Sequence, residues 1–187
     1  MVDLPVNVAV LCGGKGTRLG YDGQKCCVPV HGRPFLLHRL DQLVRCGATS
    51  LHLLVSHEAE DVFSTVGKWE PSIPINYIYD DGDGPWAAVE DAVDFIDAGT
   101  FWVANGDTWL EEPLQPSWRP NAVPLMVVTT NDETEPHNID GKYLDCGLYR
   151  VSRKHPVPSV WSYRVIDTRP YTMNTPEQLE DLREALG

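Results

Sequence analysis

Short apolar segments alternate with helix-like segments through the first 105 residues. The expected strands are β-branched or aromatic runs at residues 6–12, 51–55, 75–79 and 101–104. Between them, apolar residues at helical spacing predict helices from Pro34 to a cap at Gly47, over 59–66 and over 86–96. This order predicts an α/β fold with right-handed crossovers, in which a mostly parallel central sheet forms the middle of three αβα layers.

The regularity falls after residue 110. Two short strands, at 125–129 and 143–151, predict a smaller antiparallel addition to the parallel sheet. A last helix is expected from Pro176, because Thr175 can cap it and Gln178 completes a capping box. Internal repeats and linkers are absent from the sequence, so we expect a single domain over residues 1–187.

The composition supplies enough apolar residues for a hydrophobic core. Of the 187 residues, 42% are apolar, which excludes intrinsic disorder, collagen and a disulfide miniprotein. No apolar run approaches the roughly 20 residues of a membrane span, and the N-terminal sequence lacks the basic stretch of a signal peptide. Five cysteines without a C-x-x-C pair favour a reducing compartment. We therefore expect a soluble cytoplasmic protein.

The charge is strongly negative and unevenly spread. A net charge of -12 argues against a nucleic-acid or anionic membrane partner. Residues 1–45 hold six bases and three acids, a local +3, so the remaining residues carry -15. An acidic chain with a basic opening is suited to binding a small polyanion there; the alternative is that most of the acids are simply solvated helix faces.

The first candidate site is the segment LCGGKGTRL, which directly follows the first strand. Its glycines Gly13, Gly14 and Gly16 let backbone amides approach a phosphate, while Lys15 and Arg18 supply positive charge. The sequence is neither a P-loop nor a good dinucleotide fingerprint. An ordinary turn would explain the glycines alone, but the additional Thr17, Arg18 and Lys25 favour a polyphosphate cradle.

The second candidate site is the Asn105-Gly106-Asp107 sequence after the fourth strand. Ligands of open parallel sheets bind beyond the carboxyl ends of the strands, so Asp107 is expected to face the same crevice as the glycine loop. Mg²⁺ takes one or two carboxylates and completes its shell with phosphate oxygens and water. Together with the basic loop, Asp107 is predicted to be a magnesium ligand.

These pieces, taken in order, carry a family resemblance. The series LCGGKGTRL, Lys25, VPVHGRPFL and FWVANGDTWLE resembles the sugar-1-phosphate nucleotidylyltransferases, the pyrophosphorylase type with a GT-A-like, Rossmann-like nucleotide-binding fold. The match covers residues 6 to about 110. Farther on, YLDCGLYR and RPYTMNTPEQL are similar to a strand of the family and to its closing segment.

The resemblance implies an activity. Such an enzyme transfers a nucleoside monophosphate from a nucleoside triphosphate to a sugar 1-phosphate, and gives an NDP-sugar and pyrophosphate with Mg²⁺ as cofactor. Both substrates are anions, so positioning and charge neutralisation carry the catalysis without a protein nucleophile. Two alternatives stay open: a non-sugar phosphate as acceptor, and a nucleotide-binding regulatory protein derived from the family.

The resemblance also implies roles for individual residues. Arg18, Lys25 and Asp107 would form the catalytic set, and Trp86 would either stack on a base or sugar ring or pack against its own domain. The nucleotide would lie against Leu11, Gly13, Gly14, Lys15, Gly16, Thr17, Gly84 and Trp86. On the sugar side we expect Asn105, Trp109 and Asp145.

Three positions depart from the family pattern. Cys26 follows the lysine where proline is usual, and Gly84-Pro85-Trp86 replaces the start of a glycine-rich loop. Thr172 stands where the family places an acid, often the second metal ligand. Asp145 and Asp167 are candidates to replace that acid, or are ordinary acids at strand ends.

Overall fold

The computed structural model describes residues 5–56, 59–80, 84–111, 124–130, 138–139, 143–154 and 156–187. The helices are α1 (Phe35–Arg45), α2 (Glu60–Val66), α3 (Pro85–Ala92) and α4 (Pro176–Leu186), with 3-10 helices η1 (Thr17–Leu19) and η2 (Lys25–Cys27). The strands are β1 (Asn7–Leu11), β2 (Pro29–Val30), β3 (Arg33–Pro34), β4 (Ser50–Val55), β5 (Ile75–Tyr79), β6 (Thr100–Asn105), β7 (Thr108–Leu110), β8 (Leu125–Thr130), β9 (Asn138–Ile139), β10 (Tyr143–Ser152), β11 (Ser162–Val165) and β12 (Pro170–Thr172).

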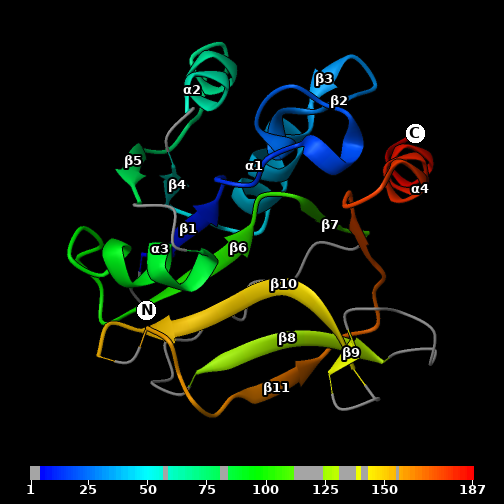
Figure 1. Ribbon diagram of the computed structural model, residues 1–187. Coiled ribbons are helices and arrows are strands. Elements are labelled where there is room, and N and C mark those ends of the chain that lie inside the picture. Colours follow the sequence, from blue (N-terminus) through cyan, green and yellow to red (C-terminus); the bar gives the residue numbers. More distant parts are fainter. Residues whose placement is uncertain are drawn as a thin grey trace.

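The central sheet has the strand order β11-β8-β10-β6-β1-β4-β5, with β9 beside β10. Its core is parallel: β1 lies between β4 and β6, and β5 follows β4 at the edge. In this register Val8 lies opposite both Leu51 and Trp102. The predicted mostly parallel sheet is confirmed, and Figure 1 shows β1 and β6 side by side at its centre.

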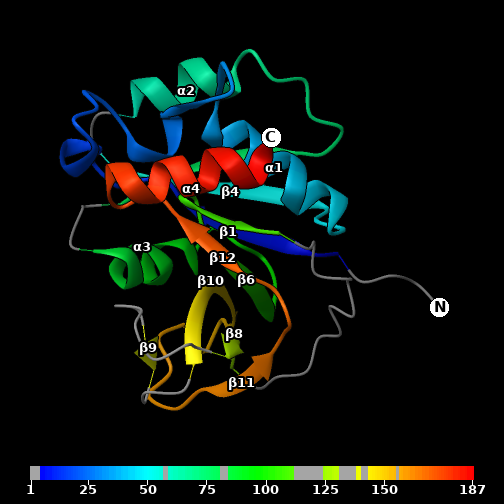
Figure 2. The same ribbon diagram turned by 90° about the vertical axis from the view of Figure 1, so that its right-hand side faces the viewer.

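Helices cover both faces of the parallel strands, so the predicted three layers are confirmed. Because side chains alternate along a strand, Val8 and Val10 pack on one face with α1 and α2, and Ala9 packs on the other face with α3. Figure 2 shows α1 and α2 on the opposite side of the strands from α3. In the part of the chain that the structure describes, no helix is long and apolar enough to cross a membrane.

The closing segment forms a second, two-stranded sheet with β7. β12 pairs antiparallel with β7, and α4 follows it. Leu179 and Leu182 of α4 pack in an apolar cluster with Phe35 and Met173. The predicted cap is confirmed, since the Thr175 hydroxyl accepts a hydrogen bond from the Gln178 amide at 3.3 Å.

The predicted antiparallel addition is confirmed: β10 pairs antiparallel with β6 and with β8, so the central sheet continues past β6. One prediction about secondary structure was wrong. Helix α3 ends at Ala92 instead of Ile96. The Phe95 amide donates a hydrogen bond to the Ala92 carbonyl, so the chain continues as a turn after the helix. Ile96 is nevertheless buried.

Candidate active site

The glycine loop leaves the carboxyl end of β1 and folds back on itself. The Gly16 amide donates to the Gly23 carbonyl at 3.0 Å, and the Lys25 amide donates to the Gly14 carbonyl at 2.8 Å. Between these bonds Lys15 and Gln24 form an isolated antiparallel bridge. The loop therefore brings Lys25 back to Gly14, near the start of the loop, although Lys25 lies eleven positions after Gly14 in the sequence.

A cavity of about 400 Å³ opens at the carboxyl edge of the parallel strands. The ends of β1, β4, β5 and β6, the glycine loop and the start of α3 all contribute to its walls. The lining consists of Leu11, Cys12, Gly13, Gly14, Lys15, Lys25, Cys26, Leu54, Ser56, Asp80, Gly84, Pro85, Ala88, Asn105 and Asp107. This is the crevice position expected for the ligand of an open α/β sheet.

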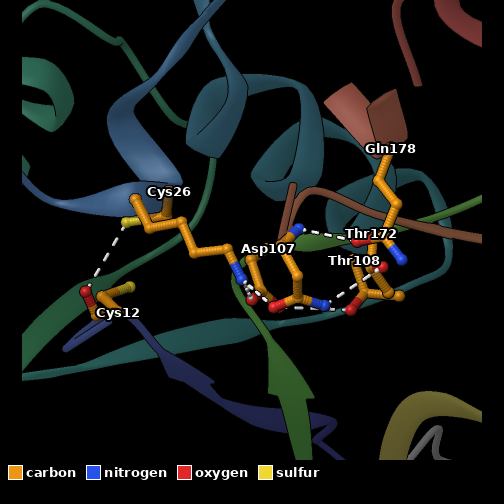
Figure 3. A network of polar contacts seen from close by, with 8 residues as sticks. Cys12, Cys26, Asp107, Thr108, Thr172 and Gln178 are labelled. Carbon is orange, nitrogen blue, oxygen red and sulfur yellow. Dashed lines mark hydrogen bonds and ion pairs between the residues drawn. The ribbon is translucent and has the colours of Figure 1, made fainter. Parts of the chain in front are cut away.

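Asp107 reaches this cavity because the chain after β6 passes very close to β1. The Gly106 amide donates to the Leu11 carbonyl at 3.0 Å. A Cβ atom at Gly106 would lie 2.5 Å from that carbonyl oxygen, so the close passage requires glycine. The ammonium of Lys25 then forms an ion pair with Oδ2 of Asp107 (Figure 3). The predicted meeting of the basic loop with the carboxylate is confirmed.

A further side chain at this point, Asn174, was not predicted. Its Oδ1 atom accepts a hydrogen bond from Lys25 Nζ at 2.6 Å. Its Nδ2 group donates to the Thr172 hydroxyl at 3.3 Å, so Thr172 contacts Asn174 (Figure 3). The family pattern led us to look for an acid at position 172. The closing segment instead supplies the amide oxygen of Asn174 to the site.

Asp107 and Asn174 together supply two oxygens that could hold a divalent cation. Asp107 supplies a carboxylate and Asn174 an amide carbonyl, and both are ligand types that hard divalent cations take. Within the described residues, no group of three or more His, Cys, Asp and Glu could hold a metal. Mg²⁺ keeps several waters and substrate phosphate oxygens in its shell, so a two-oxygen protein contribution fits it.

Two buried side chains of α1 form hydrogen bonds with the main chain of the segment that carries Asp107. Arg39 donates from Nε to the Asn105 carbonyl at 3.2 Å and from Nη1 to the Gln42 side chain. Gln42 donates from Nε2 to the Leu110 carbonyl at 2.6 Å. Burial lowers the pKa of Arg39 to about 10, which leaves it charged at neutral pH. The pair thus fixes both ends of the segment from Asn105 to Leu110.

Replacement of Gln42 by leucine is expected to lower the free energy of unfolding by about 2–3 kcal/mol, because a buried guanidinium donor and a buried carbonyl lose their partner. Urea denaturation measures the change. Arg45→Leu, on the exposed surface of the same helix, is the matched control and should unfold like the wild type. Equal stability of the two variants would show that this buried pair does not hold the segment.

The three residues predicted to bind the sugar do not lie together in the structure. Asn105 lines the cavity. Trp109 packs instead against the apolar cluster beneath α4. Asp145 accepts hydrogen bonds from the Gly147 amide at 2.8 Å and from the Tyr149 hydroxyl. Burial, and then the charge of Asp145, raise the pKa of Tyr149, so its hydroxyl keeps the proton that it donates.

Trp86 packs against its own domain, which is the second of the two positions predicted for it. Its ring packs against those of Tyr149 and Trp161, at centroid distances of 5.1 and 5.5 Å. Gly84, which caps the same helix with a φ of 114°, does line the cavity. The described lining includes neither Trp86 nor Asp145.

The remaining residues of the glycine loop lie outside the cavity lining. Thr17 and Arg18 are exposed in η1, and Gly16 is buried where a Cβ atom would meet Tyr21 at 2.9 Å. The described cavity lining does not include these three residues, nor Asp167, which is exposed. Gly16 therefore shapes the loop, while Thr17 and Arg18 face solvent at its outer turn.

Two buried thiols form part of the cavity wall. Cys26, at the position where the family pattern has proline, donates from Sγ to the Cys12 carbonyl at 3.6 Å. A hydrogen bond with Cys12, together with burial, raises the pKa of Cys26 well above its usual value. The Cys26 thiol therefore stays protonated at neutral pH, which makes it a poor nucleophile.

The chain belongs to the family described as the MobA-like NTP transferase domain, which matches residues 8–173. Among curated relatives, the bifunctional protein GlmU of Methylibium petroleiphilum is 32% identical over 109 residues. That alignment covers 57% of this chain but 24% of GlmU, so the chain spans about a quarter of the relative's length.

Three solved structures illustrate the similarity in fold. HddC from Yersinia pseudotuberculosis, complexed with GMP-PN, is 21% identical with a TM-score of 0.83, covering 97% of this chain and 100% of HddC. A putative glucose-1-phosphate thymidylyltransferase from Bacillus anthracis, in complex with a sucrose, is 18% identical with a TM-score of 0.81 and coverages of 96% and 94%. The inositol-1-phosphate CTP transferase from T. maritima is 16% identical with a TM-score of 0.77 and coverages of 97% and 95%.

Proposed function

We propose that this protein is a nucleotidylyltransferase that joins a nucleoside triphosphate and a sugar 1-phosphate into an NDP-sugar and pyrophosphate. The observation that carries the proposal is the meeting of Lys25 and Asp107 at one cavity beside the glycine loop. These residues come from segments 82 positions apart. A protein with only a structural role has no need to place an ammonium and a carboxylate at the mouth of a strand-end cavity.

The reaction needs charge neutralisation more than it needs a reactive side chain. A phosphate oxygen of the sugar phosphate attacks the α-phosphorus in line, a new P–O bond forms, and the α–β bond breaks to release pyrophosphate. Lys25 would contact the α-phosphate and offset the charge that builds there. Mg²⁺, held by Asp107 and Asn174, would supply further neutralisation of the triphosphate. The protonated thiol of Cys26 agrees with a mechanism that forms no covalent protein intermediate.

Pyrophosphate release from a panel of triphosphates and acceptor phosphates tests the proposal. Release with a sugar 1-phosphate would support it, and release only with inositol 1-phosphate or another non-sugar phosphate would assign a different acceptor. Both acceptor classes have a precedent in the names of the structural neighbours. Triphosphate binding without any Mg²⁺-dependent release would instead support a nucleotide-binding regulator.

We further expect the base to be guanine, because the wall of the cavity on the β5 side carries a carboxylate. Asp80 follows β5 and lines the cavity, three strands away from β6 and Asp107 in the order β6-β1-β4-β5. A nucleotide with its phosphates at Lys25 would therefore place its base toward Asp80. A carboxylate accepts two adjacent N–H donors, which guanine presents and uracil, thymine, cytosine and adenine do not. HddC, of the same fold, was solved with GMP-PN.

GTP is expected to exceed the other triphosphates about a hundredfold in kcat/KM, since a site built on paired hydrogen bonds rejects ligands that cannot make them. Asp80→Asn should remove most of this preference, because an amide presents a donor as well as an acceptor. Asp97→Asn is the control, because Asp97 is exposed and is not among the residues that line the cavity; this variant should retain the preference. Equal use of all five triphosphates by the wild type would contradict the assignment.

A further inference from the structure

One cation of the protein itself bridges the two oxygens that could bind magnesium. Nζ of Lys25 contacts Oδ2 of Asp107 and lies 2.6 Å from Oδ1 of Asn174. The three residues come from η2, from the turn after β6 and from the segment before α4, and Figure 3 shows the position of Asp107 among these contacts. The Lys25 side chain is 11% exposed, so the ammonium occupies this point largely out of bulk water.

Groups other than Lys25 hold both oxygens in place. The Asp107 carboxylate accepts a hydrogen bond from the Thr108 hydroxyl on Oδ1, at 3.2 Å. The Asn174 side chain donates to Thr172, which fixes the orientation of the amide so that its oxygen faces Lys25. The Asn174 main-chain amide also donates to the Gln178 side chain at 2.9 Å. A carboxylate and an amide oxygen are thus directed at one cation position that is built into the fold.

Resting on the proposed function, we propose that Lys25 is a placeholder cation. Its ammonium lies between Asp107 and Asn174, in the position that the divalent cation would take. An ammonium and a divalent cation cannot share a position between the same two oxygens, because they repel each other strongly at contact distance. Lys25 therefore excludes free metal until a triphosphate attracts the ammonium elsewhere.

The exchange would require the side chain of Lys25 to move but not its main chain. The Lys25 main chain is fixed by its bond to the Gly14 carbonyl, while its flexible stem lies along the glycine loop and lines the cavity. A triphosphate in the cavity would offer oxygens to the ammonium, which would leave Asp107 and Asn174 available to hold the metal. The Asp107 carboxylate is then compensated by a cation both before and after the exchange. Metal and nucleotide binding are consequently coupled, and the coupling acts equally in both directions.

Mn²⁺ binding to the nucleotide-free protein, followed through the electron paramagnetic resonance of free Mn²⁺, tests this proposal. Lys25→Met should bind Mn²⁺ about 10- to 100-fold more tightly than the wild type, which is the ordinary range of such couplings. Addition of Asp107→Asn to Lys25→Met should abolish that gain. Lys25→Gln, also neutral, provides the same comparison if Lys25→Met does not fold.

Lys15→Met is the matched control, because Lys15 is a second lysine that lines the same cavity and carries the same charge. It should change Mn²⁺ affinity by no more than about twofold, the effect of a screened charge at a distance. The proposal is overturned if folded Lys25→Met or Lys25→Gln binds Mn²⁺ no more tightly than Lys15→Met. This outcome is distinct from failure of the proposed function, which would appear as a folded wild type that binds no triphosphate in calorimetry with Mg²⁺ present.

Discussion

Asp107→Asn is expected to lower kcat about a thousandfold while the protein stays folded. Removal of one preorganised charged group from a reaction centre typically costs two to three orders of magnitude in kcat. Asparagine keeps the shape of aspartate but has no negative charge to pair with Lys25 or to bind a divalent cation. The side chain is 29% exposed and forms little of the core, so packing should be nearly unchanged.

The rate of pyrophosphate release at saturating substrates measures this effect, and circular dichroism confirms the fold. Asp97→Asn serves as the matched control: it removes a fully exposed carboxylate that pairs with the exposed Arg153, and it should turn over like the wild type. A normal rate for Asp107→Asn would remove Asp107 from the reaction centre. A similar loss in both variants would point to net charge rather than to the position of Asp107.

The meeting of the glycine loop with Asp107 could be predicted because it follows from sheet topology alone. β1 and β6 are buried parallel strands whose apolar runs are visible in the sequence, and their carboxyl ends lie at the same edge. The residues that follow them must therefore be neighbours. No detail of side-chain packing enters this inference, which is why it was confirmed.

Asn174 could not be predicted in the same way. Its position depends on the antiparallel pairing of β12 with β7, two strands of three residues each that carry too little pattern to be recognised. The one local signal was the capping pair of Thr175 and Gln178, which places the start of α4 directly after Asn174. That signal fixes where the helix begins but not which other segment its N-terminus approaches.

Trp109 shows where strand periodicity misleads. In an uninterrupted strand, residues 107 and 109 would lie on the same side, which led us to expect Trp109 near the sugar. The chain instead turns at Gly106 and Asp107, and β7 begins only at Thr108. The alternation restarts after the turn, so Trp109 packs in the cluster beneath α4 while Asp107 faces the cavity.

Gly106→Ala is expected to destabilise the protein by about 2–3 kcal/mol, the usual cost of overpacking a rigid site. The added methyl group would meet the Leu11 carbonyl oxygen at 2.5 Å and its carbon at 3.4 Å. Leu11 cannot easily move away, because β1 is paired on both sides, with β4 and β6. For a chain of this size, such a loss lowers Tm by roughly 4–12 °C.

The same substitution should also lower kcat, by about tenfold or more, since displacements near 1 Å at a reaction centre already have large effects. Relief of the contact with Leu11 must move the turn that carries Asp107 and so change its position relative to Lys25. Gly99→Ala is the matched control: a Cβ atom there meets nothing within 4 Å, so stability and turnover should stay close to wild type. Thermal unfolding and pyrophosphate release on the two variants separate the outcomes. If Gly106→Ala kept full activity, the position of Asp107 would not depend on the close passage of residue 106 over β1.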